Sequence, residues 1–258
     1  MDAREPTTGE TSVVKPRPTG VLVIGPGADE GGPAGRAAAA LTEAWRARGD
    51  DVEHLWPLEN KVHAANLFRR SALTVYHLAN GRAYHDVYEM ASILPGLAVL
   101  HEPVLDGLVR SLLHEGDPNG VRARREARLA QPVSERAMPG LEEPRRTPWA
   151  AHIARCSRGV VLPTEDDHVF FRAFGCRTPL FVAAEDDVEA HDRAVAATIA
   201  LLRDPARDPL SRWARSLTDV GAHMGTPAQG LGLRYVEAIR EFSPSDEHGL
   251  SPTYRHGR

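Results

Sequence analysis

The sequence is poor in cysteine and lysine, and it has no long apolar run. Its 258 residues include only Cys156 and Cys176, which cannot form the disulfide framework of a small secreted protein. No apolar stretch approaches the roughly 20 residues of a membrane span. The only lysines are Lys15 and Lys61, and the net charge is −4, so no broad basic field for nucleic acid is expected. These absences favour a cytoplasmic protein with reduced thiols, no membrane span and no nucleic-acid partner.

Both ends of the chain are polar. The opening "MDAREPTTGETSVVKPRPTG" is rich in proline and threonine and lacks the apolar centre of a signal peptide. The closing "SPSDEHGLSPTYRHGR" has a similar character. We therefore predict a disordered lead-in over residues 1–19 and a disordered tail over residues 243–258.

Six short apolar runs alternate with helical patterns between these ends. Runs that are apolar on both faces and separated by helices indicate a parallel sheet that is covered on both sides. We predict an α/β fold, with a single doubly wound, mainly parallel, Rossmann-like sheet over residues 20–187. The runs are "VLVIG" (21–25), "VEHLW" (52–56), "LTVYH" (73–77), "LAVLH" (97–101), "GVVLP" (159–163) and "PLFVA" (179–183).

Helical stripes indicate what covers this sheet. We predict one helix that ends at Gly49, one that stops at Pro95-Gly96, and C-terminal helices over residues 188–242 that pack back on the sheet. The Arg-rich segment 115–148 breaks the pattern, and we predict a helix near 119–130 followed by a Pro/Gly loop. The stripes are Ala38, Leu41 and Trp45; Val87, Met90, Ala91 and Leu94; Val188, Val195, Ile199 and Leu202; and Leu231, Tyr235, Ile239 and Phe242.

Polar side chains gather where the predicted strands end. His77, Asn80, His85, His101 and Glu102 lie at or just past two such ends, where ligands bind in doubly wound sheets. A histidine held against a carboxylate can act as an acid, a base or a hydroxyl-orienting group. A single histidine of this kind is more often a packed or surface residue, but the shared position favours a site. No set of His, Cys and carboxylate residues has firm metal-ligand spacing, so no metal and no cofactor is predicted.

The glycine-rich stretch "GPGADEGGPAGRAAAAL" follows the first predicted strand. Backbone amides around Gly31 and Gly32 could hold a phosphate at a helix N-terminus, although a loop that only turns the chain is the alternative. No Gly-Lys-Ser/Thr follows, and Glu30 interrupts a dinucleotide fingerprint. Two further acidic clusters, residues 165–167 and 185–187, are expected to cap helices or to be solvated.

Residues 75–108 resemble the N-terminal domain of retaining GT-B glycosyltransferases of family 4. Members of that family carry "Y-x-x-G-N-x-x-x-H-x-x-x-Y-E" followed by "P-G-x-x-V-L-H-D-x-x-L". Ala79 and Glu102 depart from this pattern, and Pro163-Thr164 replaces a later His-Ser pair of the family. The matching positions are Tyr76, Asn80, Tyr88-Glu89, Pro95-Gly96, Val99-Leu100-His101 and Leu105, with His85 lying one residue after the histidine position of the pattern.

The resemblance covers about residues 20–187 and implies roles for the candidate residues. His101 would be the catalytic-cleft histidine, and Asn80, His85 and Glu102 would line the acceptor side. Gly31 and Gly32 would lie near the phosphates of the donor.

The donor-binding second domain of that family has no counterpart here. Its Glu-x(7)-Glu spacing occurs at Glu135 and Glu143, but in the insertion and with no strand before it.

Two functions follow from this comparison. In the first, the chain is an acceptor domain that is inactive alone and takes part in transfer from a nucleotide sugar only with a donor-binding partner subunit. The expected partner is a protein that carries a donor-binding domain, or the chain is a homo-oligomer. In the second, it is a non-catalytic binding or regulatory module, a pseudo-glycosyltransferase that uses the old cleft for a ligand or protein partner. An unrelated doubly wound enzyme that acts alone on a small molecule is a third reading.

Overall fold

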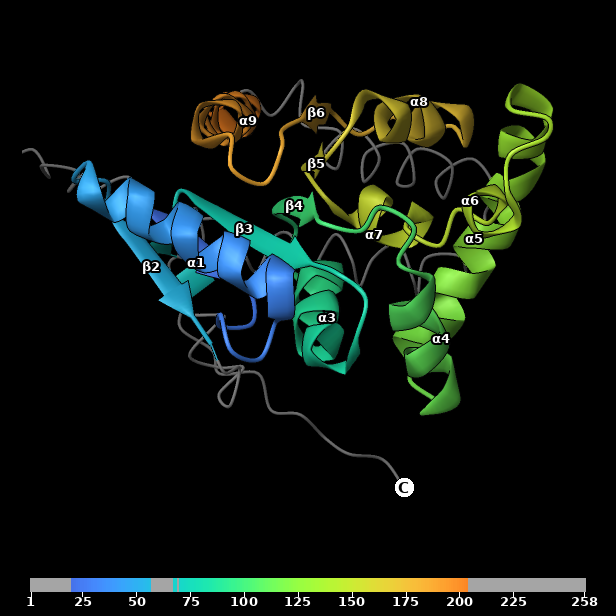
Figure 1. The fold of residues 1–258 in the computed structure, drawn as a ribbon, viewed down its shortest axis with the longest axis horizontal. Helices are drawn as coiled ribbons and strands as arrows, with labels where there is room; N and C mark the ends of the chain where they lie inside the picture. The colour runs from blue at the N-terminus through green and yellow to red at the C-terminus, as the bar shows by residue number, and fades with distance from the viewer. Residues whose placement is uncertain (1–19, 57–66, 69, 204–258) are drawn as a thin grey trace, which may run out of the picture.

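The computed structural model describes residues 20–56, 67–68 and 70–203 (Figure 1). The predicted lead-in over residues 1–19, the stripe from Leu231 to Phe242 and the predicted tail over residues 243–258 lie outside the described residues.

The described residues form one sheet of six strands, all parallel, in the order β2-β1-β3-β4-β5-β6. The predicted α/β fold with a single doubly wound parallel sheet is therefore confirmed. The strand order reverses between β1 and β3, which is the point where open sheets of this kind bind ligands. The strands are β1 (Val21–Ile24), β2 (Val52–Leu55), β3 (Leu73–Leu78), β4 (Leu97–Leu100), β5 (Gly159–Leu162) and β6 (Leu180–Val182).

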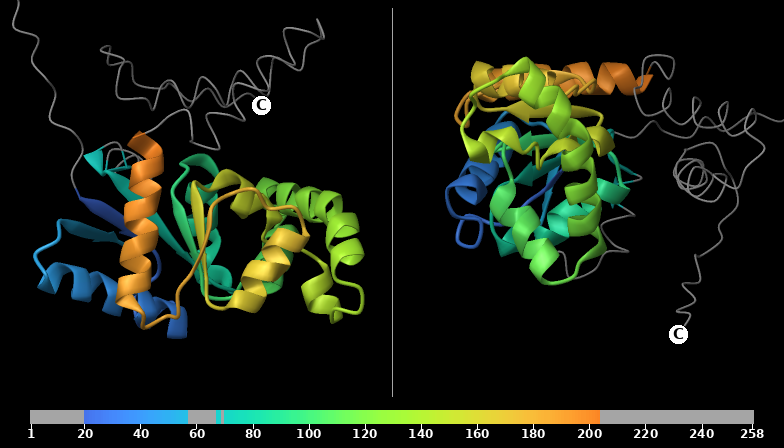
Figure 2. Two further views of the ribbon diagram at one scale, coloured as in Figure 1. Left: turned by 90° about the horizontal axis from the view of Figure 1, so that it is seen from above. Right: turned by 90° about the vertical axis from the view of Figure 1, so that its right-hand side faces the viewer.

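Helices cover both faces of the sheet, as the views in Figure 2 show. One face carries α1 and α9, and the other carries α3 and α8 with α4, α5 and α7 packed around them. The helices are α1 (Gly32–Ala47), α3 (His85–Ile93), α4 (Asp106–His114), α5 (Pro118–Ala137), α6 (Glu143–Arg146), α7 (Ala151–Cys156), α8 (Glu165–Ala173) and α9 (Val188–Arg203), with a 3-10 turn, η1, at Arg82–Tyr84.

Strand β3 shows why the sheet needs cover on both sides. All six of its residues are buried, and successive side chains point to opposite faces. Tyr76 belongs to the larger core, which includes the fully buried Phe171 of α8. Val75 belongs to the smaller core, which includes Ala194 of α9. Burying an apolar side chain of this size stabilises the fold by roughly 1.5–3 kcal/mol, so both layers contribute.

The predicted helix ends agree with the structure in most places. Helix α1 buries its predicted stripe and is followed by Gly49 at φ +87°, and α3 stops just before Pro95-Gly96. The side chain of Thr164 accepts a hydrogen bond from the Asp167 backbone at the start of α8. Asp187 accepts one from the Ala190 backbone (2.9 Å) at the start of α9. The cluster at 165–167 therefore forms the first turn of α8, and Asp187 of the second cluster caps α9.

Helix α5 is longer than the sequence pattern predicts. It runs over Pro118–Ala137 with Pro132 inside it, where a Pro/Gly loop was expected. An internal proline costs a helix a hydrogen bond, but packing can override that cost. Here Ala130 and Ser134 on either side of Pro132 are buried, so tertiary contacts keep the segment helical past the proline.

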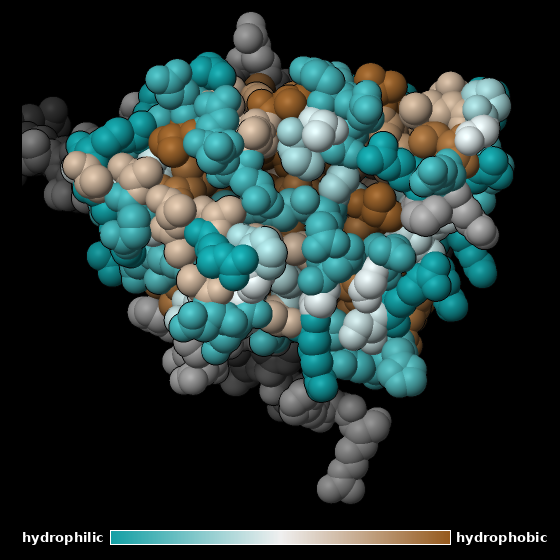
Figure 3. Space-filling view, viewed as in Figure 1, coloured by the Kyte–Doolittle hydropathy of each residue, from teal (hydrophilic) through white to brown (hydrophobic). Residues whose placement is uncertain are grey.

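The described helices lack the combination of length and apolar character needed to traverse a bilayer. On the face shown in Figure 3, hydrophobic residues are scattered in separate patches among hydrophilic ones.

Candidate functional site

The centre of the candidate site is His101, the residue directly after β4. Its backbone N–H donates to the Leu78 carbonyl (2.9 Å), which extends the ladder between β3 and β4 by one residue. Its Nδ1 lies 2.9 Å from Oε1 of Glu185, which follows β6. Its Nε2 lies 2.9 Å from Nδ1 of His77 on β3, and the two rings stack with centroids 5.2 Å apart. A carboxylate and two imidazoles therefore form one hydrogen-bonded chain across three strand ends.

The protons of this chain can be placed by elimination. A carboxylate only accepts hydrogen bonds, so His101 donates from Nδ1 to Glu185. In a neutral ring Nε2 is then the acceptor, so His77 donates to it from Nδ1. This leaves Nε2 of His77 without a proton, and that atom is buried with no hydrogen-bond partner among the described residues.

The electrostatics favour these neutral rings. Burial lowers the pKa of His77 well below its usual value, and the charges of His101, His191 and His54 would lower it further. Burial also lowers the pKa of His101, although the hydrogen bond to Glu185 opposes that shift. Both imidazoles are therefore neutral near pH 7, each with one ring proton.

Asn80 and Glu102 lie beside this chain, after β3 and β4. The Asn80 amide donates to the Glu102 carboxylate, and its Oδ1 accepts from the backbone N–H of Leu108 (3.0 Å). Asn80 therefore caps α4, whose preceding residue, Leu105, has left-handed backbone geometry (φ 52°). Gly107 leaves room for this contact, because a Cβ there would lie 3.2 Å from Oδ1 of Asn80.

The glycine loop after β1 reaches the same edge through Tyr84. The Tyr84 hydroxyl donates to the Gly31 carbonyl (2.7 Å). Burial raises the pKa of Tyr84 to about 12, and the charges of Glu102 and Glu185 contribute, so all three groups lie near one another. Gly32, at φ +58°, begins α1 beside this contact. We call His101, Glu185, Asn80, Glu102 and Tyr84 the polar rim.

His85 lies apart from the contacts of the polar rim. Its Nδ1 is 3.2 Å from a carboxylate oxygen of Glu115, so it links the start of α3 to the end of α4. The structure therefore brings His101, Asn80, Glu102 and the Gly31-Gly32 loop to one edge. His85 instead contacts Glu115, which is not part of the polar rim.

Sequence reasoning did not select Glu185 or Tyr84 as site residues. Glu185 was interpreted as part of a capping cluster, a role that Asp187 fills. Its position two residues past a predicted strand was the available signal, because Glu102, the other acid of the rim, also follows a strand closely. Tyr84 carried no such signal, since its hydroxyl reaches a loop 53 residues away in the sequence.

A second group of polar side chains, Tyr88, His152 and Cys156, lies at the larger core and is expected to be unreactive. The Tyr88 hydroxyl lies 3.1 Å from Nδ1 of His152, and Cys156 Sγ lies 3.7 Å from its Nε2. Burial raises the pKa of Cys156 to about 12 and lowers that of His152 to about 4. A neutral thiol beside a neutral imidazole is a poor nucleophile, so this group is structural.

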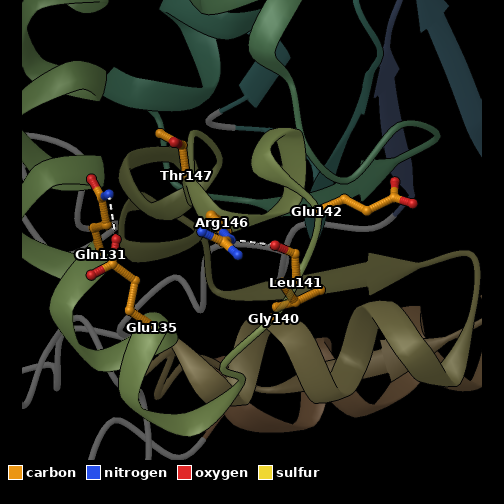
Figure 4. Close-up of a pocket in the computed structure, with 7 residues that line it drawn as sticks. All are labelled: Gln131, Glu135, Gly140, Leu141, Glu142, Arg146 and Thr147. Atoms are coloured by element: carbon orange, nitrogen blue, oxygen red, sulfur yellow. Dashed lines mark hydrogen bonds between the residues drawn. The ribbon is translucent and has the colours of Figure 1, made fainter.

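A cavity of about 550 Å³ lies at the α5–α6 junction, away from the sheet edge (Figure 4). Two of its charged groups are already engaged: Glu135 accepts from Gln131 (2.7 Å), and Arg146 donates to the Leu141 carbonyl. Its lining residues are Gln131, Glu135, Gly140, Leu141, Glu142, Arg146 and Thr147.

The described residues contain no cluster of three or more His, Cys, Asp or Glu side chains arranged to hold a metal ion.

No protein-family model, curated protein or solved structure matches the chain.

Proposed function

We propose that the protein is a glycosyltransferase-like acceptor domain that takes part in sugar transfer only with a donor-binding partner subunit. One observation carries this proposal. Three residues of the family-like stretch, Asn80, His101 and Glu102, lie together at the carboxyl ends of β3 and β4, next to the topological switch point. Ligands of doubly wound sheets bind at that place.

The chemistry of the polar rim suits a ligand rich in hydroxyl groups. Each sugar hydroxyl donates one hydrogen bond and accepts others, so a sugar is recognised by carboxylates and neutral polar groups held in fixed positions. Glu102 is held by Asn80, and Glu185 is held by His101. Both carboxylates therefore offer acceptor oxygens without first having to be ordered.

The same rim is poorly suited to grip the donor. Retaining transfer requires the charge of the leaving diphosphate to be stabilised as the glycosidic bond breaks. The charged members of the polar rim are the carboxylates Glu102 and Glu185, which repel a diphosphate. This is why the proposal assigns the nucleotide sugar to a partner subunit.

The test begins with a pull-down of the full chain from its native host and identification of the co-purifying proteins. We expect no sugar transfer by the purified chain alone and transfer by the reconstituted complex. His101→Ala should abolish the joint activity and leave association intact, while His114→Ala, at an exposed site at the end of α4, should change neither. Robust transfer by the isolated chain would overturn the proposal.

A non-catalytic binding module is the second candidate, and one feature favours it. Both ends of the Asn80 amide are used inside the protein, one to cap α4 and the other to hold Glu102. Thr164, which replaces the serine of the family, is likewise used to cap α8. A complex whose activity is indifferent to His101 would support this candidate.

A further inference from the structure

We propose that Glu185, rather than His101, is the residue of the polar rim that contacts the acceptor, where its carboxylate accepts a hydrogen bond from a sugar hydroxyl. This rests on the proposed function and names the ligand-contacting group of that site. His101 and His77 then act as positioning residues behind Glu185.

The first argument is accessibility. The His101 side chain is 3% exposed and the Glu185 side chain is 48% exposed, although the two are hydrogen-bonded to each other. A ligand approaching the sheet edge therefore meets the carboxylate first.

The second argument is the use of the His101 nitrogens. Nδ1 is engaged by Glu185 and Nε2 by His77, both at 2.9 Å. A neutral imidazole has only these two polar atoms, so in this arrangement His101 has none left for a ligand. Glu185 uses Oε1 for His101, and a carboxylate has a second oxygen with further acceptor capacity.

The third argument is how firmly the carboxylate is held. His77 is 1% exposed and fully within the sheet, so its ring has little freedom. Its Nδ1–H donates to Nε2 of His101, which favours the same Nδ1–H tautomer of His101 that the Glu185 carboxylate requires. The proton on Nδ1 points at Glu185, which orders an otherwise half-exposed side chain in one position. A preordered acceptor loses less entropy when a ligand hydroxyl binds.

The ligand class follows from this geometry. The Glu185 carboxylate is held in place by the neutral imidazoles of His101 and His77, so it can accept a hydrogen bond from a ligand hydroxyl. Glu102, fixed by Asn80 and close enough to Tyr84 to act on the same phenol, offers a second acceptor. Two such acceptors at one edge suit a ligand that carries more than one hydroxyl.

The probe is a panel of methyl glycosides of glucose, galactose, mannose and N-acetylglucosamine, titrated into the full chain and followed by saturation-transfer NMR. We expect Glu185→Ala to weaken the Kd of the glycoside that binds best by about tenfold to a hundredfold, as for a lost hydrogen bond to a charged group. Glu185→Gln, which keeps the size of the side chain, should also weaken binding and guards against a folding defect in the alanine variant. Glu43→Ala, an exposed carboxylate on α1 paired with Arg46, should bind as the wild type does.

The positioning role has a readout of its own. His77→Leu should weaken binding by about threefold to tenfold, and ¹⁵N spectra of the imidazoles should show that His101 no longer populates only the Nδ1–H tautomer. His77→Asn, whose amide N–H lies near the former Nδ1, should restore both. A merely structural role for His77 would leave the tautomer unchanged.

Two failures can be told apart. If the wild type binds a glycoside, and Glu185→Ala binds it equally well while His101→Ala does not, the assignment of Glu185 is overturned and the proposed function stands. If the wild type binds no glycoside of the panel, the proposed function is overturned, and the role of Glu185 falls with it.

Discussion

Acid should destabilise the protein through His152, and the effect is large enough to measure. This imidazole is 9% exposed and hydrogen-bonds to the Tyr88 hydroxyl. Burial lowers its pKa to about 4, and the charges of Arg122 and Arg155 act in the same direction. The unfolded chain has no such environment, so its histidine titrates near pH 6.5.

The sign follows from proton binding. Below pH 6.5 the unfolded state binds a proton at His152 that the folded state does not bind, so unfolding becomes more favourable. The contribution is fully present above pH 6.5 and is lost as the pH falls toward about 4. Each pH unit in this window is worth about 1.4 kcal/mol, so lowering the pH from 7.5 to 5.0 should cost about 2 kcal/mol through His152 alone. His77, His101 and His191, whose pKa values are also lowered mainly by burial, add to the loss.

Urea unfolding of the wild type and of His152→Gln at pH 7.5, 6.5, 5.5 and 5.0 isolates this contribution, because every other titrating group is common to both chains. We expect the variant to be less stable at pH 7.5 and the difference to shrink by about 2 kcal/mol at pH 5.0. His114→Gln, at an exposed site, should follow the wild-type curve. Parallel pH profiles for the wild type and His152→Gln would refute the reasoning.

Three further changes test the packing around the site by urea unfolding. Phe171→Ala empties a fully buried position and should cost about 3–5 kcal/mol; a cost below about 1.5 kcal/mol would mean that the core is not packed as described. Asn80→Ala removes the cap of α4 and should cost about 0.5–2 kcal/mol, and an unchanged urea midpoint would contradict the capping role. Gly35→Ala places a Cβ against the Gly27 carbonyl oxygen and should cost about 1–3 kcal/mol. An unchanged urea midpoint would show that the glycine loop can shift to make room for the methyl group.

The sheet was predictable because its signal is local. Each strand is a short apolar run, and burial on both faces removes the polar alternation that would otherwise obscure it. The end of α5 was not predictable in this way, because Pro132 argues for a stop and only contacts with distant helices outweigh it. Glu185 was missed for a related reason. Its partner His101 is 84 residues earlier, and no pattern within the sequence shows that the chain after β6 turns back across the end of β5.

The position of α9 has a consequence for synthesis on the ribosome. This helix, Val188–Arg203, covers the face that carries Val75, Val99 and Val161 from three central strands. About 40 residues separate the end of β5 from the end of α9, so at about 5–20 residues per second this face stays uncovered by α9 for about 2–8 s after β5 has been made. During that interval the nascent sheet presents a broad apolar surface, which a holding chaperone would recognise. The last described helix to be translated is therefore the one that covers this apolar face.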